Sequence, residues 1–160
     1  MSDFVSVPAP EPDAKMRLRL WLRLLKMSRR IEADLRENLR REFATTLPRF
    51  DVMAALSRYR QGLKMSELSG VLMVSNGNVT GIIDRLVEDG FVMRSPVPHD
   101  RRASLVRLTR EGREEFARQA AAHEAWIDRL LSEFSAAEAE GISDRLEDVY
   151  SAIAQQGSRT

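Results

Sequence analysis

The residues best suited to chemistry in this chain of 160 residues share one helical face. Asn78, Thr80 and Arg85 lie in a stretch whose apolar residues recur three and four positions apart. That spacing is typical of a helix with one buried side, so the three polar side chains fall on or beside the opposite face. Amide, hydroxyl and guanidinium groups are the ones that hydrogen-bond base edges and phosphates. The stretch from 75 to 89 therefore predicts a helix that carries contacts to a nucleic acid.

Two glycines on the same face strengthen this interpretation. Gly77 and Gly81 each cost about 1 kcal/mol relative to Ala in a helix interior, so a merely solvated face gains nothing from them. A face that must let another backbone come close does gain from them. Ser75 is the expected N-cap of this helix. The helix N-terminus, which is favourable for phosphate, is then expected to face the same partner. The other interpretation, a solvated face with tolerated glycines, is favoured by the nearby carboxylates of Asp84 and Glu88, although Asp84 could instead orient an arginine.

A basic hairpin is expected directly after this helix. Strands are predicted at 91–95 and 104–108, joined by a segment rich in proline and arginine. Arg101 and Arg102 at the tip suit a narrow minor groove, where the negative potential is deepest. Asp100 is expected to pair with one of these arginines and fix its direction. A solvated loop with a surface ion pair is the alternative, and such a pair stabilises a fold very little.

The remaining pattern predicts helices around this unit. Apolar spacing and caps indicate helices at about 13–43, from Pro48 to about 61, from Ser66 to 72, at 110–132 and at 136–155. Thr109 and Ser135 are the expected N-caps of the last two, and Gly90 is expected to end the helix at 75–89. The order is α-α-α-α-β-β-α-α, a mainly helical winged helix-turn-helix. The apolar stripe on the first, long helix needs another surface to cover it.

Composition limits the other classes of function. The chain has no cysteine, its net charge is +1, and its basic and acidic residues are segregated along the sequence. No nucleophile–base pair, metal cluster or phosphate-cradling glycine loop is visible, so we expect neither an enzyme nor a metal site nor a cofactor. The acidic, proline-rich start lacks the features of a signal peptide, and we expect a cytoplasmic protein that does not bind membranes. The alternative is a membrane-surface or protein-partner adaptor that uses the basic amphipathic N-terminal helix.

Three segments resemble the MarR family of transcriptional regulators. The run Asp100-Arg101-Arg102-Ala103-Ser104-Leu105-Val106-Arg107-Leu108-Thr109, followed by Gly112, is similar to that family's wing. The run Val74-Ser75-Asn76-Gly77-Asn78-Val79-Thr80-Gly81, with Asp84-Arg85-Leu86 and Gly90, resembles its recognition helix. The run Leu47-Pro48-Arg49-Phe50-Asp51-Val52-Met53 resembles its second helix. The residues at 49–52 and 76–81 are most similar to those of members that control the breakdown of aromatic acids.

The resemblance implies a homodimer that binds a pseudo-palindromic operator in double-stranded DNA. It further implies a repressor released by a small effector, an aromatic carboxylate or an aromatic acyl-CoA, bound where the dimerisation and DNA-binding layers meet. The expected division is a flexible arm at 1–13, dimerisation helices at 14–46 and 110–156, a DNA-binding domain at 47–109 and a flexible tail at 157–160.

These expectations name two sets of residues. The expected DNA-binding residues lie on the two central helices and the wing: Ser66, Ser75, Asn76, Gly77, Asn78, Thr80, Gly81, Arg85, Arg94, Arg101 and Arg102. The expected effector-binding residues are aromatic or apolar side chains and one arginine: Trp21, Arg17, Phe43, Phe50 and Met53. Packing in a core is the alternative for each apolar member of the second set.

Overall fold

The computed structural model describes residues 12–72 and 76–157. Residues 1–11 of the expected arm at 1–13, the expected N-cap Ser75 and residues 158–160 of the expected tail lie outside these residues, and Pro12 and Asp13 belong to a helix. The chain divides into two compact units, one up to Ala121 and one from Ala122 onward. Within the described ranges, no helix is both long and apolar enough to cross a membrane.

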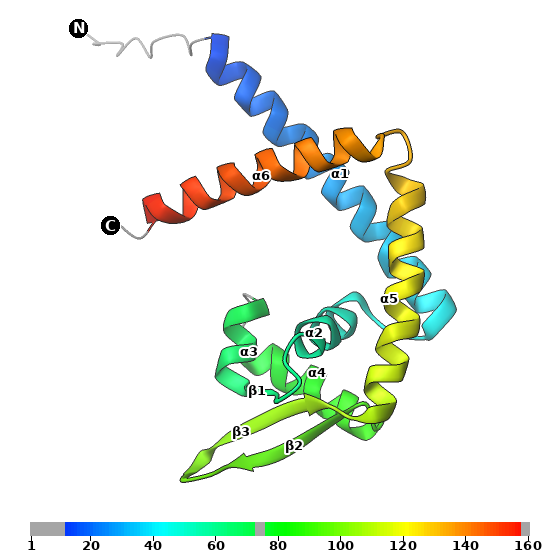
Figure 1. Ribbon diagram of the computed structural model, residues 1–160, viewed down its shortest axis with the longest axis vertical. Coiled ribbons are helices and arrows are strands. Elements are labelled where there is room, and N and C mark those ends of the chain that lie inside the picture. The colour runs from blue at the N-terminus through cyan, green and yellow to red at the C-terminus, as the bar shows by residue number, and fades with distance from the viewer. Residues whose placement is uncertain (1–11, 73–75, 158–160) are drawn as a thin grey trace, which may run out of the picture. The chain divides into compact units, whose positions relative to one another are not determined.

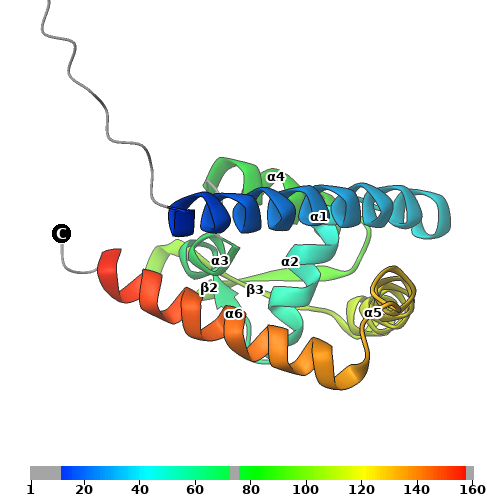
Figure 2. The ribbon, with the colours of Figure 1, turned by 90° about the horizontal axis from the view of Figure 1, so that it is seen from above.

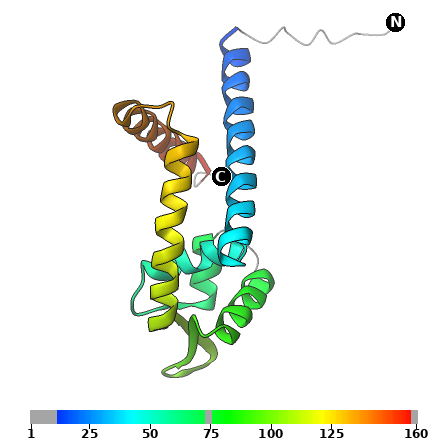
Figure 3. The same cartoon turned by 90° about the vertical axis from the view of Figure 1, so that its right-hand side faces the viewer.

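The first unit begins with the long helix α1, Pro12–Phe43, which is followed by α2, Leu47–Ser57. Thr46 caps α2, since its Oγ1 accepts a hydrogen bond from the backbone N–H of Arg49 at 3.3 Å. Pro48 lies in the first turn of α2, where its missing N–H has no cost. Figure 3 shows the N-terminal turns of α1 extending away from α2, α3 and α4.

Three short elements and a hairpin follow (Figure 1). Strand β1, Leu63–Lys64, leads into α3, Met65–Leu72, and α4, Asn76–Glu88, follows. Strands β2, Val92–Val97, and β3, Asp100–Leu108, form an antiparallel hairpin that reaches out from the helices. The sheet order is β1-β3-β2, with Leu63 opposite Val106 and Val92 opposite Leu108. The strand β1 was absent from the sequence-based expectation, and the hairpin strands are longer than predicted.

The core of the first unit joins α2, α3, α4 and the sheet. The buried side chains come from all of these elements and include Met53, Leu56, Leu68, Val79, Ile83, Leu86, Val92 and Val106. Burial of this kind is the main favourable term in folding. Because α4 contributes Val79, Ile83 and Leu86 to this core, its polar face is turned outward.

Thr109 connects the hairpin to the next helix, α5, Arg110–Leu130. Its hydroxyl donates to the carbonyl of Gly90 at 2.6 Å and accepts from the N–H of Gly112 at 3.0 Å. One residue thereby caps α5, as the sequence predicted, and also holds the turn that ends α4.

The second unit contains the end of α5 and the helix α6, Ala136–Gly157, which Figure 2 shows as one continuous helix. Ser135 and Glu138 form a capping box, in which Ser135 Oγ accepts from the Glu138 N–H at 3.2 Å and Glu138 Oε2 accepts from the Ser135 N–H at 2.8 Å. No residue of α6 is buried.

Candidate nucleic-acid interface

The two faces of α4 are as the sequence predicted for most of its length. Val79, Ile83 and Leu86 are each 0% exposed, whereas Asn78, Thr80, Gly81 and Arg85 are exposed. The apolar Val87, expected on the buried side, is 38% exposed. The outward face of α4 therefore presents an amide, a hydroxyl and a guanidinium without depending on any of them for the core.

Gly81 has no structural need to be glycine within this chain. A Cβ built at this position meets no atom within 4 Å. Packing inside the described residues therefore does not require this glycine, and the close approach of an external backbone stays a prediction for it. The side chain of Asn76 and the surroundings of Gly77 lie outside the described part, as does Ser75.

The hairpin is joined to α4 by an ion pair. Arg94 on β2 contacts Asp84 on α4, with Nη1 2.7 Å from Oδ1. Arg94 was expected to contact DNA, which stays a prediction, and the structure gives it a carboxylate partner on the helix. Asp84 thus orients a wing arginine, one of the two roles the sequence left open for it.

At the tip, Asp100 acts on the backbone. Its Oδ1 accepts a hydrogen bond from the backbone N–H of Arg102 at 3.1 Å. The expected pairing of Asp100 with an arginine side chain is replaced by this turn, next to His99, whose φ is 65°. Arg101 and Arg102 are both exposed, so their guanidinium groups are available to a partner.

A groove brings several of the expected DNA-binding residues together. It has a volume of about 340 Å³ and is bounded by the start of α3, by α4 and by β3. Ser66, Thr80 and Arg102 line it, together with Lys64 and Ser104. Arg85 lies elsewhere on the outward face of α4, with Nη1 3.9 Å from Oε2 of Glu88, and its side chain is 73% exposed. An exposed pair at this distance holds Arg85 only weakly.

A second cavity, of about 260 Å³, lies on another side of the first unit. It is formed by the end of α1, by α2, by the end of α4 and by α5, and Phe43 and Met53 line it as expected. Arg49 and Gln119 also line it, and each has a buried atom without a hydrogen-bond partner, Arg49 Nε and Gln119 Oε1. A buried unpaired donor and a buried unpaired acceptor are costly, and here both occur at one cavity. We call this space the Arg49 cavity.

The other expected effector residues do not line the Arg49 cavity. Phe50 is buried and its ring lies 5.6 Å from that of Phe116, which is the core-packing alternative. Trp21 lies 22 residues before Phe43 on α1, which corresponds to roughly 33 Å along the helix axis. Arg17 lies still farther along α1, with Nη2 3.9 Å from Oδ2 of Asp13. Within one chain α1 therefore does not bring Trp21 or Arg17 to Phe43.

The functional candidates that sequence reasoning missed are Arg49, Asp89 and Gln119. Arg49 on α2 forms an ion pair with Asp89, which directly follows α4. These two residues are 40 positions apart. Neither periodicity nor local spacing signals such a contact. The sequence indicated Arg49 only as part of the run at 47–53 that resembles the second helix of the MarR family.

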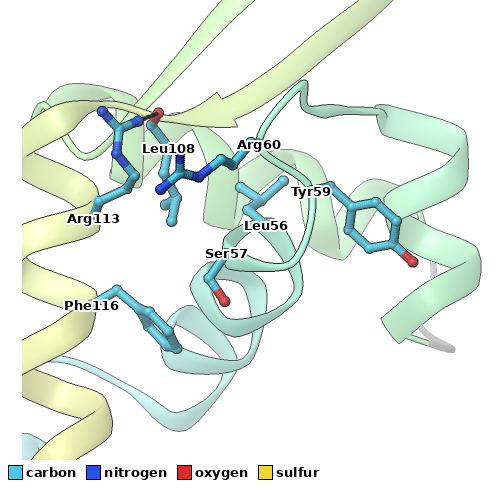
Figure 4. Close-up of a pocket in the computed structure, with 7 residues that line it drawn as sticks. All are labelled: Leu56, Ser57, Tyr59, Arg60, Leu108, Arg113 and Phe116. Carbon is cyan, nitrogen blue, oxygen red and sulfur yellow. Dashed lines mark hydrogen bonds between the residues drawn. The ribbon is translucent and has the colours of Figure 1, made fainter.

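A third cavity, of about 210 Å³, lies between the end of α2, the end of β3 and the start of α5 (Figure 4). Figure 4 shows the side chains of Arg60 and Arg113 both reaching to Leu108, with Leu56 and Phe116 among the other lining residues. Arg113 Nη1 donates to the carbonyl of Leu108 at 3.2 Å. None of the residues expected from the sequence lines this cavity, so it is a useful comparison for the Arg49 cavity.

Comparison with known proteins gives a consistent family. The MarR family model matches residues 45–104, which include α2, α3, α4 and most of the hairpin. The transcriptional activatory protein BadR of Rhodopseudomonas palustris is 38% identical over 105 residues, which are 63% of this chain and 59% of BadR. The chain thus spans less than two thirds of the length of that curated relative.

Solved structures match over nearly the whole chain. A MarR family transcriptional regulator from Silicibacter pomeroyi has 31% sequence identity and a TM-score of 0.75, with 90% of this chain and 99% of that chain covered. A mutant MarR from E. coli, solved in complex with operator DNA, has 26% identity and a TM-score of 0.72, with 88% of this chain and 99% of that one covered. With this fold, this hairpin and this match at 31% identity, the chain belongs to the MarR family.

Proposed function

We propose that the chain is a DNA-binding transcriptional regulator that acts as a homodimer and responds to a small effector. The observation that carries the proposal is the groove in which Ser66, Thr80 and Arg102 come together, next to the exposed face of α4. The E. coli MarR mutant with the same fold was solved with operator DNA, which supports this use of the surface.

The contacts divide by chemistry. Helix α4 enters the major groove, where Asn78, Thr80 and Arg85 read base edges and Gly81 allows the helix backbone to approach. The hairpin follows the adjacent minor groove with Arg101 and Arg102. Ser66 at the start of α3 meets the phosphate backbone. Asp84 and Arg94 keep the hairpin and α4 in one arrangement, so that both grooves are met at once.

The dimer is supported by apolar surface on the terminal helices. On α1, seven large apolar side chains from Met16 to Met27 are between 38% and 58% exposed. On α6, Ile142, Leu146, Val149 and Ile153 are each at least 41% exposed and follow one another at steps of four, three and four. Apolar surface of this extent is exposed on a single chain when a second surface covers it in the assembly. We propose that a second copy of the chain covers it.

A binding assay with two readouts tests this proposal. Mass determination in solution reports the oligomeric state, and a mobility-shift titration uses the DNA upstream of the protein's own gene against a scrambled duplex of the same length. We expect a dimer that shifts the upstream duplex at a concentration at least about a thousandfold lower than the scrambled one. A monomer, or equal affinity for the two duplexes, contradicts the proposal.

We further propose that the effector is a small aromatic carboxylate, free or as its CoA thioester, bound in the Arg49 cavity. Arg49 lines the cavity and has a buried, unpaired Nε that would pair with a carboxylate or carbonyl oxygen, and Phe43 and Met53 line it for an apolar ring. In the CoA case, Arg17 and Trp21 would serve the nucleotide part from the α1 of the second copy. Binding releases the protein from DNA, and release from an operator within the promoter relieves repression.

Variants of two arginines separate this cavity from the one in Figure 4. Arg49→Met removes the guanidinium of the Arg49 cavity, and Arg60→Met makes the same change in the other cavity. We expect release from DNA by aromatic acids in the wild type and in Arg60→Met, but not in Arg49→Met. A reporter gene that registers both increases and decreases decides the sign, since BadR is named an activatory protein. The opposite pattern between the two variants would move the effector to the other cavity.

A further inference from the structure

The guanidinium of Arg49 has a partner at one nitrogen and a buried nitrogen without one. Its side chain is 17% exposed, its Nη2 contacts Asp89 and its Nε is buried without a partner. In a guanidinium, Nε–H and one N–H of Nη2 point from the same edge, and this edge matches the two oxygens of a carboxylate. Asp89 therefore occupies one of the two donors of that edge and leaves the other, Nε, buried without a partner in a residue that lines the Arg49 cavity.

Asp89 is in turn attached to the last turn of α4. Its N–H donates to the carbonyl of Arg85 at 3.0 Å, and Phe91 N–H donates to the carbonyl of Leu86 at 3.0 Å. The chain then continues from Phe91 into β2, the first strand of the wing. A carboxylate at a helix C-terminus faces the negative end of the helix dipole, so Asp89 depends on Arg49 for compensation. The ion pair thus holds the junction of recognition helix and wing against α2.

We propose that an effector carboxylate and Asp89 compete for the same edge of Arg49. A bound carboxylate takes Nε and Nη2 together, which removes the partner of Asp89 and frees the end of α4 from α2. Conversely, DNA binding that holds α4 in place favours the Arg49–Asp89 pair and lowers the affinity for the effector. This exchange supplies the differential contact that a coupling between two sites requires. The inference rests on the effector proposal above and assigns its regulation to one residue pair.

The exchange predicts opposite effects of one substitution on the two ligands. Asp89→Ala removes the competitor, so benzoate, used as the probe, binds the full-length protein about threefold or more tightly in calorimetry without DNA. The same variant binds the upstream duplex about five- to tenfold more weakly, because the end of α4 is no longer held. A merely structural role for Asp89 would not tighten the binding of benzoate.

Two further variants complete the experiment. Arg49→Met loses benzoate binding, and its effect on DNA affinity does not add to that of Asp89→Ala in the double variant, since both break one pair. Glu114→Ala, which removes an exposed carboxylate paired with Arg110, is the matched control and leaves both affinities unchanged. Circular dichroism and thermal unfolding verify that each variant is folded.

The outcomes separate this inference from the proposed function. If the wild type binds its duplex and benzoate releases it, but Asp89→Ala binds benzoate with unchanged or lower affinity, the competition is wrong and the regulator stands. If the wild type binds DNA but not benzoate, the competition is also overturned. If the wild type binds no duplex, the proposed function itself fails.

Discussion

At the scale of single residues, two arginines contact carboxylates at different parts of the recognition helix. Arg94 reaches Asp84 in the middle of α4, and Arg49 reaches Asp89 just beyond its end. The sequence placed Arg94 among the DNA contacts, because an arginine in a basic hairpin has no other visible partner. The pairing across ten positions became apparent only in the folded hairpin. Asp84 and Arg94 thus link the hairpin to α4, and a contact of Arg94 with DNA stays a prediction.

Gly81→Ala separates stability from DNA binding at this scale. No atom lies within 4 Å of the added Cβ, so the variant gains the helix propensity of Ala, about 1 kcal/mol in unfolding free energy. In the proposed interface the methyl group stands between α4 and the DNA, and operator affinity falls about tenfold or more. Urea unfolding and mobility-shift titrations measure the two effects.

Gly70→Ala is the control for this substitution. Gly70 is also helical and exposed, and its added Cβ also meets nothing within 4 Å. We expect the same gain in stability with unchanged DNA affinity. Undiminished DNA binding by Gly81→Ala would show that α4 does not approach DNA through this face.

At the scale of elements, the helices could be predicted closely because their ends carry local signals. The caps Thr109 and Ser135 and the stop at Gly90 were all visible in the sequence, and α5 and α6 begin where these predicted. Strand β1 could not be predicted, because two residues show no alternation and its existence depends on pairing with β3. Likewise, the groove at Thr80 could be anticipated from side-chain types, but the Arg49 cavity could not, since four separate elements form it.

The junction of the wing with α5 offers a second prediction. A Cβ at Gly112 would overlap the backbone carbonyl of Phe91, and a backbone atom cannot move aside as a side chain can. Gly112→Ala is therefore expected to lower the free energy of unfolding by about 3 kcal/mol, the upper end of the usual cost of overpacking. Urea unfolding measures it, and Gly141→Ala, where the Cβ meets nothing within 4 Å, should not destabilise the protein.

The start of α6 should depend on pH. The backbone N–H of Ser135, and then its hydroxyl, hold the pKa of Glu138 below its ordinary value of 4.5. Because the folded pKa is the lower one, the stabilisation by the Glu138 carboxylate is complete above that ordinary value and is lost as the pH falls through the lowered pKa. Glu138→Gln should thus be less stable than the wild type at about pH 7, and this difference should shrink on acidification to about pH 3.

Unfolding at both pH values, with Glu140→Gln as a matched control, tests this dependence. The control changes the same charge two residues further along α6, outside the capping box. A stability difference for Glu138→Gln that is the same at both pH values would mean that the capping carboxylate does not stabilise the helix.

At the scale of the whole molecule, the proposed DNA readout uses residues of the first unit, and the exposed stripe of α6 belongs to the second. The proposed dimer requires apolar surface on α1 and α6, and the proposed readout requires two copies of α4 on successive major grooves, roughly 34–36 Å apart. The match to the Silicibacter pomeroyi protein confirms both the family and the fold. The proposed use of that fold for DNA binding rests on the residues of the wing and α4.

The salt dependence of operator binding by Arg102→Ala tests the central claim most directly. Arg107, also exposed on β3 but away from the tip and in contact with Met93 Sδ at 3.2 Å, provides the matched variant Arg107→Ala. If each Arg102 neutralises one phosphate-lined site, the slope of log K against log salt concentration becomes shallower by about 0.9 per protomer in Arg102→Ala. We predict this change, with lower affinity for the operator, and a wild-type slope for Arg107→Ala. An unchanged slope and affinity in Arg102→Ala would contradict the assignment of the wing to DNA.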